Sequence, residues 1–313
     1  MSAYILFHSD SDGRFGGYCA WKYFKENYPA TKLVMHEVQY GEPMPLDPAL
    51  LNMCDEVYIL DFSYDRATLE SLNKRVGKLV VLDHHKKAEE QLRGLPYAKF
   101  DLTKSGALLA WEYFFPTQKA PMACLYVNDR DLWIWEFGQD TAAFEAFLKV
   151  DHVGTDWPVW DSLSKDEEVL KEAVKKGRGY LAYEYSVIAS FVSNKKNFKA
   201  ATLLTSECSM NATVYEGMGI LTSEIAAKIY KDDKVDLTIE YRFRGDNISF
   251  SMRSKKVDVS EIAACWGGGG HASAGGFSVP VNIGLDIIRS LVIDKALMIP
   301  DTAQSISGGR INI

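Results

Sequence analysis

The stretch VLDHH, Val81–His85, decides how this sequence folds and where its chemistry lies. It closes the apolar run Lys78–His84 with an aspartate and two adjacent histidines, in a chain that holds six histidines in all. Neighbouring side chains on a strand point to opposite faces, so one of two adjacent histidines is always badly placed to pack into a core. Where a strand leaves its sheet, however, two imidazoles can meet a ligand together.

The first 150 residues predict an α/β fold. Three further apolar runs precede VLDHH: Ala3–Ser9, Lys32–Val38 and Glu56–Phe62. Their near-continuous apolar character is typical of strands in a parallel sheet that is covered on both faces. Helix-like stretches accompany them: GGYCAWKYFKENY, YDRATLESLNK and GALLAWEYFF. The alternation predicts a doubly wound, mainly parallel sheet in a first domain, residues 1–150.

The rest of the chain predicts a linker and a second, smaller unit. Residues 151–198 are largely polar and end in one or two helices with a charged front half, which favours a helical linker over a functional charge run. Over residues 199–300, strand-like segments alternate with the helix-like segments TSEIAAKIYKD and VSEIAACW. This pattern indicates an α+β unit, and residues 301–313 are expected to form a loosely docked tail.

Composition narrows the class of protein. The 313 residues are 47% apolar and 25% charged, which is typical of a soluble globular protein, and no apolar run reaches the roughly 20 residues of a membrane span. The five cysteines lack paired spacing, and the N-terminus does not resemble a signal peptide, so we expect a cytoplasmic protein with reduced thiols. The net charge of −7 argues against long duplex nucleic acid as a partner. A homodimer is compatible with all of this.

Acidic residues gather where the predicted strands end. Asp10 and Asp12 follow the first strand, Asp61 ends the third and Asp83 ends the fourth. A lone aspartate there is often a helix cap, and Asp10 could be that alone. However, the ends of parallel strands share the edge where ligands bind, and carboxylates gathered without cations raise one another's pKa. Carboxylate and imidazole donors without thiolate suit Mn²⁺, Mg²⁺ or Fe²⁺, and two such ions sharing a carboxylate commonly hydrolyse phosphate esters.

Four motifs resemble those of the DHH phosphoesterases: HSDSDG, LDFSYD, LDHH and VND. The segment SMRSKKVDVSEIAACWGGGGHASAGGF, residues 251–277, resembles the DHHA1 substrate-binding domain of the same family. The two motif sets occur in the family's order, over residues 1–150 and 200–280. The resemblance is specific for the superfamily and much less so for the substrate.

The resemblance implies two divalent ions, Mn²⁺ foremost with Mg²⁺ as the alternative, and six metal ligands: His8, Asp10, Asp12, Asp61, His84 and Asp129. Asp10 and Asp12 would hold separate ions, and Asp61 would bridge them. Asp131 competes with Asp129 because it lies two residues further on. In several branches of the family the first-motif histidine stands further from the first aspartate, so His8 either ligates from a shortened loop or is a neighbour only.

The resemblance also implies groups that act on the substrate. His85 would meet the substrate phosphate, and Asp83 would orient an imidazole. Arg253 and His271 would grip the substrate end distant from the scissile bond. A glycine run could be a flexible hinge, or its N–H groups could approach phosphate closely; the residues expected to do so are Gly268, Gly269 and Gly270. The run does not match a dinucleotide-binding fingerprint.

These features favour a manganese-dependent phosphodiesterase that hydrolyses short oligonucleotides to 5′-mononucleotides, as in the oligoribonuclease branch. A small-molecule phosphatase or phosphodiesterase acting on pAp, a cyclic dinucleotide or polyphosphate is the alternative enzyme. A non-catalytic nucleotide sensor is the alternative of another class. We expect the aromatic stretch Asp131–Phe137 to lie in the core rather than to stack bases.

Overall fold

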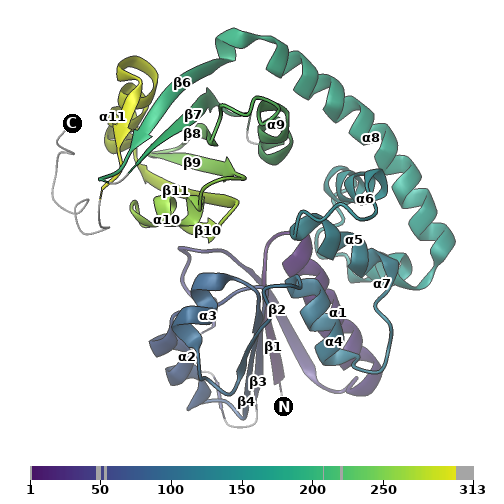
Figure 1. Ribbon diagram of the computed structural model, residues 1–313. Coiled ribbons are helices and arrows are strands. Elements are labelled where there is room, and N and C mark those ends of the chain that lie inside the picture. Colours follow the sequence, from purple (N-terminus) through teal and green to yellow (C-terminus); the bar gives the residue numbers. More distant parts are fainter. Residues whose placement is uncertain (1, 47–50, 53–54, 207, 219–220, 301–313) are drawn as a thin grey trace. The chain divides into compact units, whose positions relative to one another are not determined.

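The computed structural model describes residues 2–46, 51–52, 55–206, 208–218 and 221–300. They divide into two compact units, Met1–Tyr183 and Glu184–Ile313, and the boundary falls inside the long helix α8 (Glu167–Ser193) (Figure 1). The expected tail, residues 301–313, lies outside the described residues. None of the described helices has the length and apolar character needed to cross a membrane.

The sheet of the first unit is wholly parallel, with the order β2-β1-β3-β4-β5. Its strands are β1 (Ser2–His8), β2 (Lys32–Val38), β3 (Glu56–Leu60), β4 (Lys78–Asp83) and β5 (Ala98–Phe100). The chain runs from β1 to β2 on one side and then to β3 on the other, so β1 lies at the switch point. Ligands bind at the carboxyl ends of strands beside such a point. The predicted doubly wound α/β fold is confirmed.

Helices cover both faces of this sheet (Figure 1). The helices on the sheet are α1 (Ser11–Asn27), α2 (Arg66–Asn73), α3 (Lys86–Leu92) and α4 (Gly106–Phe114). Three further helices, α5 (Met122–Asp131), α6 (Gln139–Val150) and α7 (Trp157–Lys165), pack against α1, α4 or one another. Ile5 and Phe7 of β1 pack with α1 and α4, whereas Leu6 packs with α2 and α3. Since successive strand residues face opposite sides, β1 contributes to both halves of the core.

The second unit has a mixed sheet in the order β10-β11-β9-β8-β7-β6-β12. Its strands are β6 (Phe198–Leu204), β7 (Ser209–Glu216), β8 (Leu237–Arg244), β9 (Asn247–Ser254), β10 (Gly269–His271), β11 (Ala274–Pro280) and β12 (Ala296–Met298). The helices α9 (Thr222–Ile229), α10 (Val259–Ala264) and α11 (Val281–Arg289) complete it. Ile248, Phe250 and Met252 alternate along β9 and face the core. The predicted α+β unit is therefore present.

Candidate metal centre

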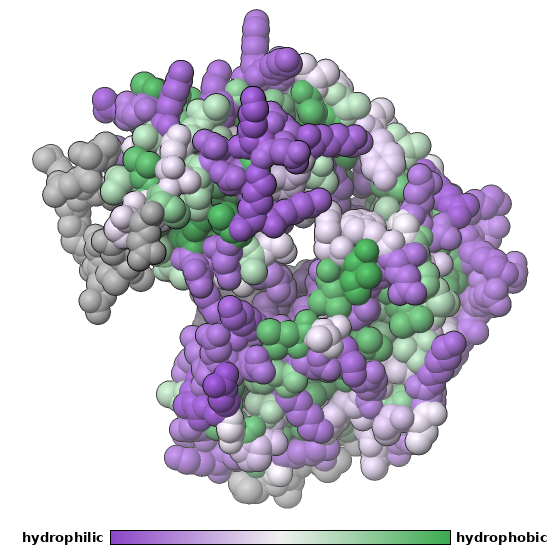
Figure 2. All heavy atoms as spheres, in the orientation of Figure 1, coloured by the Kyte–Doolittle hydropathy of each residue, from purple (hydrophilic) through white to green (hydrophobic). Residues whose placement is uncertain are grey.

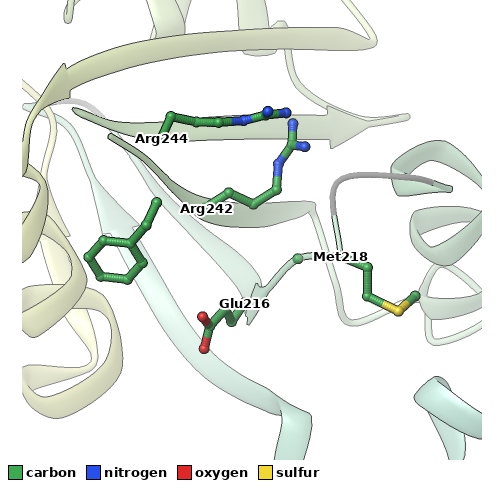
Figure 3. A pocket seen from close by; sticks show the side chains of 6 residues that line it. Glu216, Met218, Arg242 and Arg244 are labelled. Carbon is green, nitrogen blue, oxygen red and sulfur yellow. The ribbon is translucent and has the colours of Figure 1, made fainter. Parts of the chain in front are cut away.

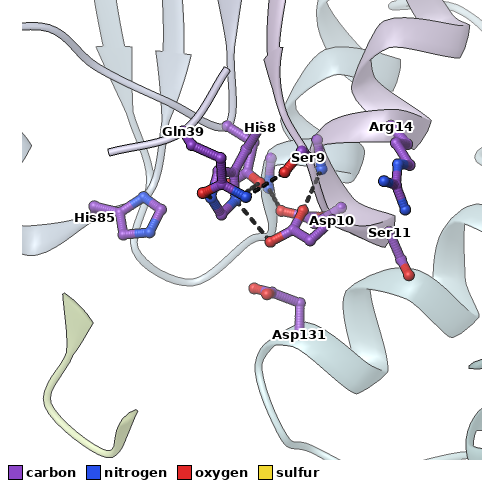
Figure 4. Close-up of polar contacts among 12 residues, drawn as sticks. His8, Ser9, Asp10, Ser11, Arg14, Gln39, His85 and Asp131 are labelled. Carbon is purple, nitrogen blue, oxygen red and sulfur yellow. Dashed lines mark hydrogen bonds and ion pairs between the residues drawn. The ribbon is translucent and has the colours of Figure 1, made fainter. Parts of the chain in front are cut away.

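The strands of the first unit deliver acidic and histidine side chains to one edge of the sheet. His8 ends β1, Asp83 ends β4, and Asp61 directly follows β3. Asp131, the last residue of α5, reaches the same place from the helical side (Figure 4). Residues far apart in the sequence thus meet where a parallel sheet binds ligands.

Asp61 lies between two groups of donor atoms. Nδ1 of His8 is 2.7 Å from Oδ2 of Asp10 and 3.7 Å from Oδ2 of Asp61. On the other side, Nε2 of His84 is 3.2 Å from Oδ1 of Asp61 and 3.7 Å from Oδ2 of Asp12. Within each group, one ligand atom per residue lies within 4.8 Å of the others. Two donor groups that share a carboxylate have the layout of a two-metal site.

The backbone of Asp61 is strained and firmly held. Its φ of 54° lies in the left-handed region, which disfavours residues other than glycine by about 1 kcal/mol or more. Its N–H donates to the carbonyl of Leu82 at 2.8 Å. A Cβ on Gly106 would lie 2.3 Å from Cβ of Asp61, so only glycine fits at the start of α4. Strain of this kind concentrates at functional sites.

The electrostatics of the cluster call for cations. Burial raises the pKa of both Asp61 and Asp131 well above the usual range, and the charge of Asp12 raises both further. Among the described residues, Oδ1 of Asp61 and Oδ2 of Asp131 are buried without a hydrogen-bond partner. Burial opposes a charge on His8, yet its hydrogen bonds to Asp10 and Asp61 raise its pKa to about 11. Divalent cations would neutralise this cluster, and its carboxylate and imidazole donors fit Mn²⁺ or Mg²⁺.

The two aspartates of HSDSDG also cap helices. Oδ1 of Asp10 accepts the N–H of Gly13 at 2.9 Å in the first turn of α1. Oδ2 and Oδ1 of Asp12 accept the N–H groups of Gly106 and Ala107 at 2.6 and 2.9 Å, at the start of α4. Each carboxylate oxygen keeps a further lone pair. The helix N-termini therefore orient both carboxylates and stabilise their charge without using up their capacity as ligands.

Asp83 orients the second histidine of the pair. Its fully buried Oδ1 is 2.6 Å from Nδ1 of His85 and accepts the backbone N–H of His84 at 2.7 Å. Oδ2 accepts the hydroxyl of Ser63 at 2.5 Å. Burial opposes ionisation of Asp83, but His85 and Ser63 hold its pKa below the usual value. The hydrogen bond to Nδ1 thus fixes the orientation of the His85 ring.

The structure places the two candidates of the fourth motif differently, with Asp129, the predicted ligand, outside the cluster. The buried Asp129 accepts the backbone N–H of Glu136 at 2.7 Å with Oδ1 and the hydroxyl of Thr141 with Oδ2. Asp131 instead places Oδ2 at 3.5 Å from Nε2 of His84. Asp129 anchors the segment that follows α5, whereas the carboxylate of the competing candidate, Asp131, lies in the cluster.

Comparisons with known proteins agree with this geometry. No model of a protein family matches the chain. It is 25% identical, over 331 aligned residues, to oligoribonuclease NrnB of Bacillus subtilis, with 97% of this chain and 79% of that protein covered. This similarity supports a DHH/DHHA1 phosphoesterase.

Two further proteins are similar to this chain over most of its length. It is 26% identical over 289 residues to the uncharacterized protein R106 of Acanthamoeba polyphaga mimivirus, covering 88% of this chain and 66%, just under two thirds, of that protein. The pGpG-specific phosphodiesterase PggH from Vibrio cholerae matches with a TM-score of 0.50 and 15% identity, over 94% of this chain and 98% of that chain. The latter match shows that the two proteins share a fold.

The two tryptophans of the aromatic stretch Asp131–Phe137 do not lie in the hydrophobic core. The prediction that placed this stretch in the core is therefore wrong for them. Trp133 and Trp135 are only partly buried, lie outside the hydrophobic clusters of the described residues, and have φ angles of 58° and 64°. The guanidinium of Arg130 lies 4.3 Å from the ring centre of Trp133 and 5.5 Å from that of Trp135. Ile134 between them is 54% exposed. The stretch therefore forms a strained aromatic surface directly after Asp131.

The DHHA1 residues lie in the sheet of the second unit. Arg253 of β9 donates from Nε to the hydroxyl of Ser223 at 2.9 Å and from Nη1 to the carbonyl of Met252 at 2.9 Å. Ala274 of β11 pairs with Arg253 on one side and with His271 on the other. Arg253 and His271, the two predicted substrate contacts, therefore lie at the same level of the sheet. They are two strands apart, which places their backbones about 10 Å from each other.

Part of the glycine run is held in this sheet rather than forming a free hinge. Gly269 and Gly270 belong to β10, which pairs with β11. A Cβ on Gly268 would lie 2.1 Å from a carbonyl oxygen of β11, and Gly270 has a φ of 131° and a similar close approach. Packing thus requires glycine at these two positions, whereas a Cβ on Gly269 would meet nothing within 4 Å. Packing therefore does not explain why position 269 is glycine.

Proposed function

We propose that this DHH/DHHA1 phosphoesterase hydrolyses short oligonucleotides to 5′-mononucleotides with the help of two divalent cations, Mn²⁺ foremost. The observation that carries the proposal is the position of Asp61 between two donor groups, with a buried Oδ1 that lacks a hydrogen-bond partner among the described residues. The name of the Bacillus relative, oligoribonuclease, and that of the Vibrio protein, a pGpG-specific phosphodiesterase, support a nucleotide substrate.

The residues of the cluster divide into two sets of ligands around the shared carboxylate. One set is His8, Asp10 and Asp61, and the other is Asp12, Asp61, His84 and Asp131. A bound metal pair supplies hydroxide from water and stabilises negative charge on phosphoryl oxygens. Asp83 fixes the ring of His85, and this histidine would contact a phosphate oxygen of the substrate.

The tryptophan surface supports a nucleotide over polyphosphate. Trp133 and Trp135 follow Asp131 closely in the sequence and are partly accessible. Aromatic rings and a stacked guanidinium bind nucleobases by stacking, and they offer a polyphosphate chain little. A base held there would belong to a nucleotide whose phosphate lies at the metal ligands.

A turnover panel with Mn²⁺ tests the proposal. The substrates are a dinucleotide, a short RNA, the matching DNA, pAp, cyclic di-AMP and polyphosphate. We expect release of 5′-mononucleotides from the dinucleotide and the short RNA. Cleavage of polyphosphate, pAp or the cyclic dinucleotide alone would replace the substrate but keep the site. Nucleotide binding without any turnover would overturn the enzyme in favour of a sensor.

The matched variants for this panel are Asp61→Asn and Asp65→Asn. Both remove one carboxylate charge, but Asp65 is an exposed cap of α2 that accepts the N–H of Thr68, a role that asparagine also fills. Removing a residue that hydrogen-bonds to a metal ligand typically lowers metal-dependent activity about 10–100-fold. Removing the shared ligand itself should lower the activity further. Wild-type activity in Asp61→Asn would rule out the shared-carboxylate mechanism.

A further inference from the structure

The sheet of the second unit carries a cavity that is not formed by any of the predicted substrate contacts. Its volume is about 410 Å³, and six residues line it (Figure 3): Glu216, Gly217, Met218, Arg242, Phe243 and Arg244. Three of the six come from the end of β8, and the others follow or end β7. None of them belongs to the DHHA1 residues discussed above.

The cavity is separate from Arg253. In the β8–β9 register, Arg253 pairs with Thr238, whereas Arg242 and Arg244 lie four and six residues further along β8. At about 3.4 Å per residue, Arg242 is roughly 14 Å along the strand from the level of Arg253. Side chains at every second position share one face, so both arginines lie on the face of Thr238 but near the other end of the strand.

A buried carboxylate holds one of the two arginines in place. Oε1 of Glu240, whose side chain is 0% exposed, lies 3.1 Å from Nε of Arg242. The hydroxyl of Tyr215 donates to Oε2 of Glu240 at 3.4 Å. A Cβ on Gly217 would lie 2.0 Å from Oε1, so glycine at this position leaves the room that Glu240 needs. A carboxylate this deeply buried requires a paired charge, and the pairing orders the side chain of Arg242 at the cavity.

The other arginine adds a second positive charge. Arg244 is exposed, and no carboxylate in the described part of the chain is close enough to pair with it. Figure 3 shows the guanidinium groups of Arg242 and Arg244 at the same end of the cavity, whereas the carboxylate of Glu216 points away from them. Two like charges that converge are stabilised by an anion, and the planar guanidinium binds phosphate through two N–H groups at once.

We propose that this cavity is a second phosphate-binding site, formed by Arg242 and Arg244 and ordered by Glu240. Its ligand is a phosphate group of the nucleotide class. That group belongs either to the backbone of an oligonucleotide longer than the hydrolysed unit or to a free 5′-mononucleotide. The site concerns binding alone, so it does not depend on the hydrolysis proposed above.

The salt dependence of binding tests this site. The full chain is titrated with a labelled eight-nucleotide RNA and, separately, with 5′-AMP, in buffer with EDTA and at several KCl concentrations. Arg244→Gln is the test variant because it leaves the Glu240–Arg242 pair intact. Arg289→Gln is the matched control, since it removes an exposed guanidinium from α11 in the same unit.

We expect the slope of log Kobs against log salt for the RNA to fall by about 0.7 in Arg244→Gln, the value for one lost contact to a single-strand phosphate. The control should keep the wild-type slope. An unchanged RNA slope with weakened 5′-AMP binding would support the site and identify the mononucleotide as its occupant. Equal slopes and equal 5′-AMP affinities in the two variants would overturn the proposal. Because no metal is present, failure of the proposed hydrolysis would leave this result unaffected.

Discussion

Asp61 combines three properties that rarely occur together in one residue: a left-handed backbone, a fully buried carboxylate and two flanking histidines. Its φ is 54° and its side chain is 2% exposed. His8 lies on one side of it and His84 on the other. The left-handed backbone destabilises the fold and burial raises the pKa of the carboxylate, whereas the hydrogen bond to His8 lowers that pKa. Together they are consistent with a residue that is stabilised only when cations are bound.

Asp61→Asn should therefore have opposite effects on the metal-free and metal-loaded protein. Because the folded-state pKa of Asp61 is raised, its contribution to stability is present below the unfolded pKa of about 3.9 and is lost as the pH rises through the folded pKa. At pH 8 in EDTA the variant should thus melt at a higher temperature than the wild type. Excess Mn²⁺ should reverse this order of melting temperatures. A free Mn²⁺ concentration of about 100 times Kd stabilises the wild type by about 2.7 kcal/mol.

Thermal unfolding with and without Mn²⁺ measures both effects. Asp65→Asn serves as the control and should respond to Mn²⁺ as the wild type does. An equal rise in the melting temperature of Asp61→Asn on addition of Mn²⁺ would contradict the assignment of Asp61 as a shared ligand.

Asp129 and Asp131 should separate stability from metal binding. Asp129→Asn weakens hydrogen bonds that the carboxylate accepts from Glu136 and Thr141, so the free energy of unfolding should fall by about 1–3 kcal/mol. Asp131→Asn removes a carboxylate whose pKa is raised, so it should leave the metal-free stability unchanged or higher and weaken Mn²⁺ binding. Urea unfolding and calorimetric Mn²⁺ titration of both variants check this. A greater loss of Mn²⁺ affinity in Asp129→Asn, at unchanged stability, would restore Asp129 as the ligand.

At the scale of elements, the start of α4 connects the packing of the first unit to the proposed metal ligands. The N–H groups of Gly106 and Ala107 hold Asp12, and Gly106 also packs against Asp61. One helix turn therefore positions carboxylates from both ligand sets. The contact between α1 and α4 supports this turn from behind.

Gly106→Ala should disrupt the metal centre. The added Cβ would lie 2.3 Å from Cβ of Asp61, and overpacking of this kind lowers stability by about 1–3 kcal/mol. Gly179→Ala is the control, because Gly179 is also helical and its Cβ would meet nothing within 4 Å; it should stabilise the protein by about 0.4–1 kcal/mol. Chemical unfolding and Mn²⁺ titration measure both variants. Equal effects of the two substitutions would show that α4 does not constrain Asp61.

The sequence predicts the interior of the elements better than their ends. The apolar runs predicted β2 with its observed bounds and β1, β3 and β4 within a residue or two, because each of these strands is a near-continuous apolar run. The three-residue strand β5 is too short to leave such a run and was not predicted. Helix α1 begins at Ser11, five residues before the predicted Gly16, since the cap by Asp10 outweighs the glycine-rich start. The choice between Asp129 and Asp131 depends on the backbone after α5, where Trp133 and Trp135 adopt left-handed conformations that no local pattern predicts.

For the whole molecule, the motifs pointed to the cluster around Asp61 but not to the cavity of the second unit. The DHH motifs place ligand types at strand ends, where topology alone brings them together. The cavity depends on the burial of Glu240 and on its pairing with Arg242, whereas the sequence shows only alternating charges that are typical of a solvated strand. Buried ion pairs that order a surface arginine are therefore visible only in the folded unit.

Each unit has a hydrophobic core of its own, so calorimetry should resolve two unfolding transitions. All proposed metal ligands lie in the first unit. Mn²⁺ should therefore raise the melting temperature of one transition and leave the other in place, because a ligand stabilises the state to which it binds. Asp61→Asn should abolish this shift, and Arg244→Gln should leave it intact. A single transition would show that the units unfold as one cooperative body, and equal shifts of two transitions would show that the second unit also binds the metal.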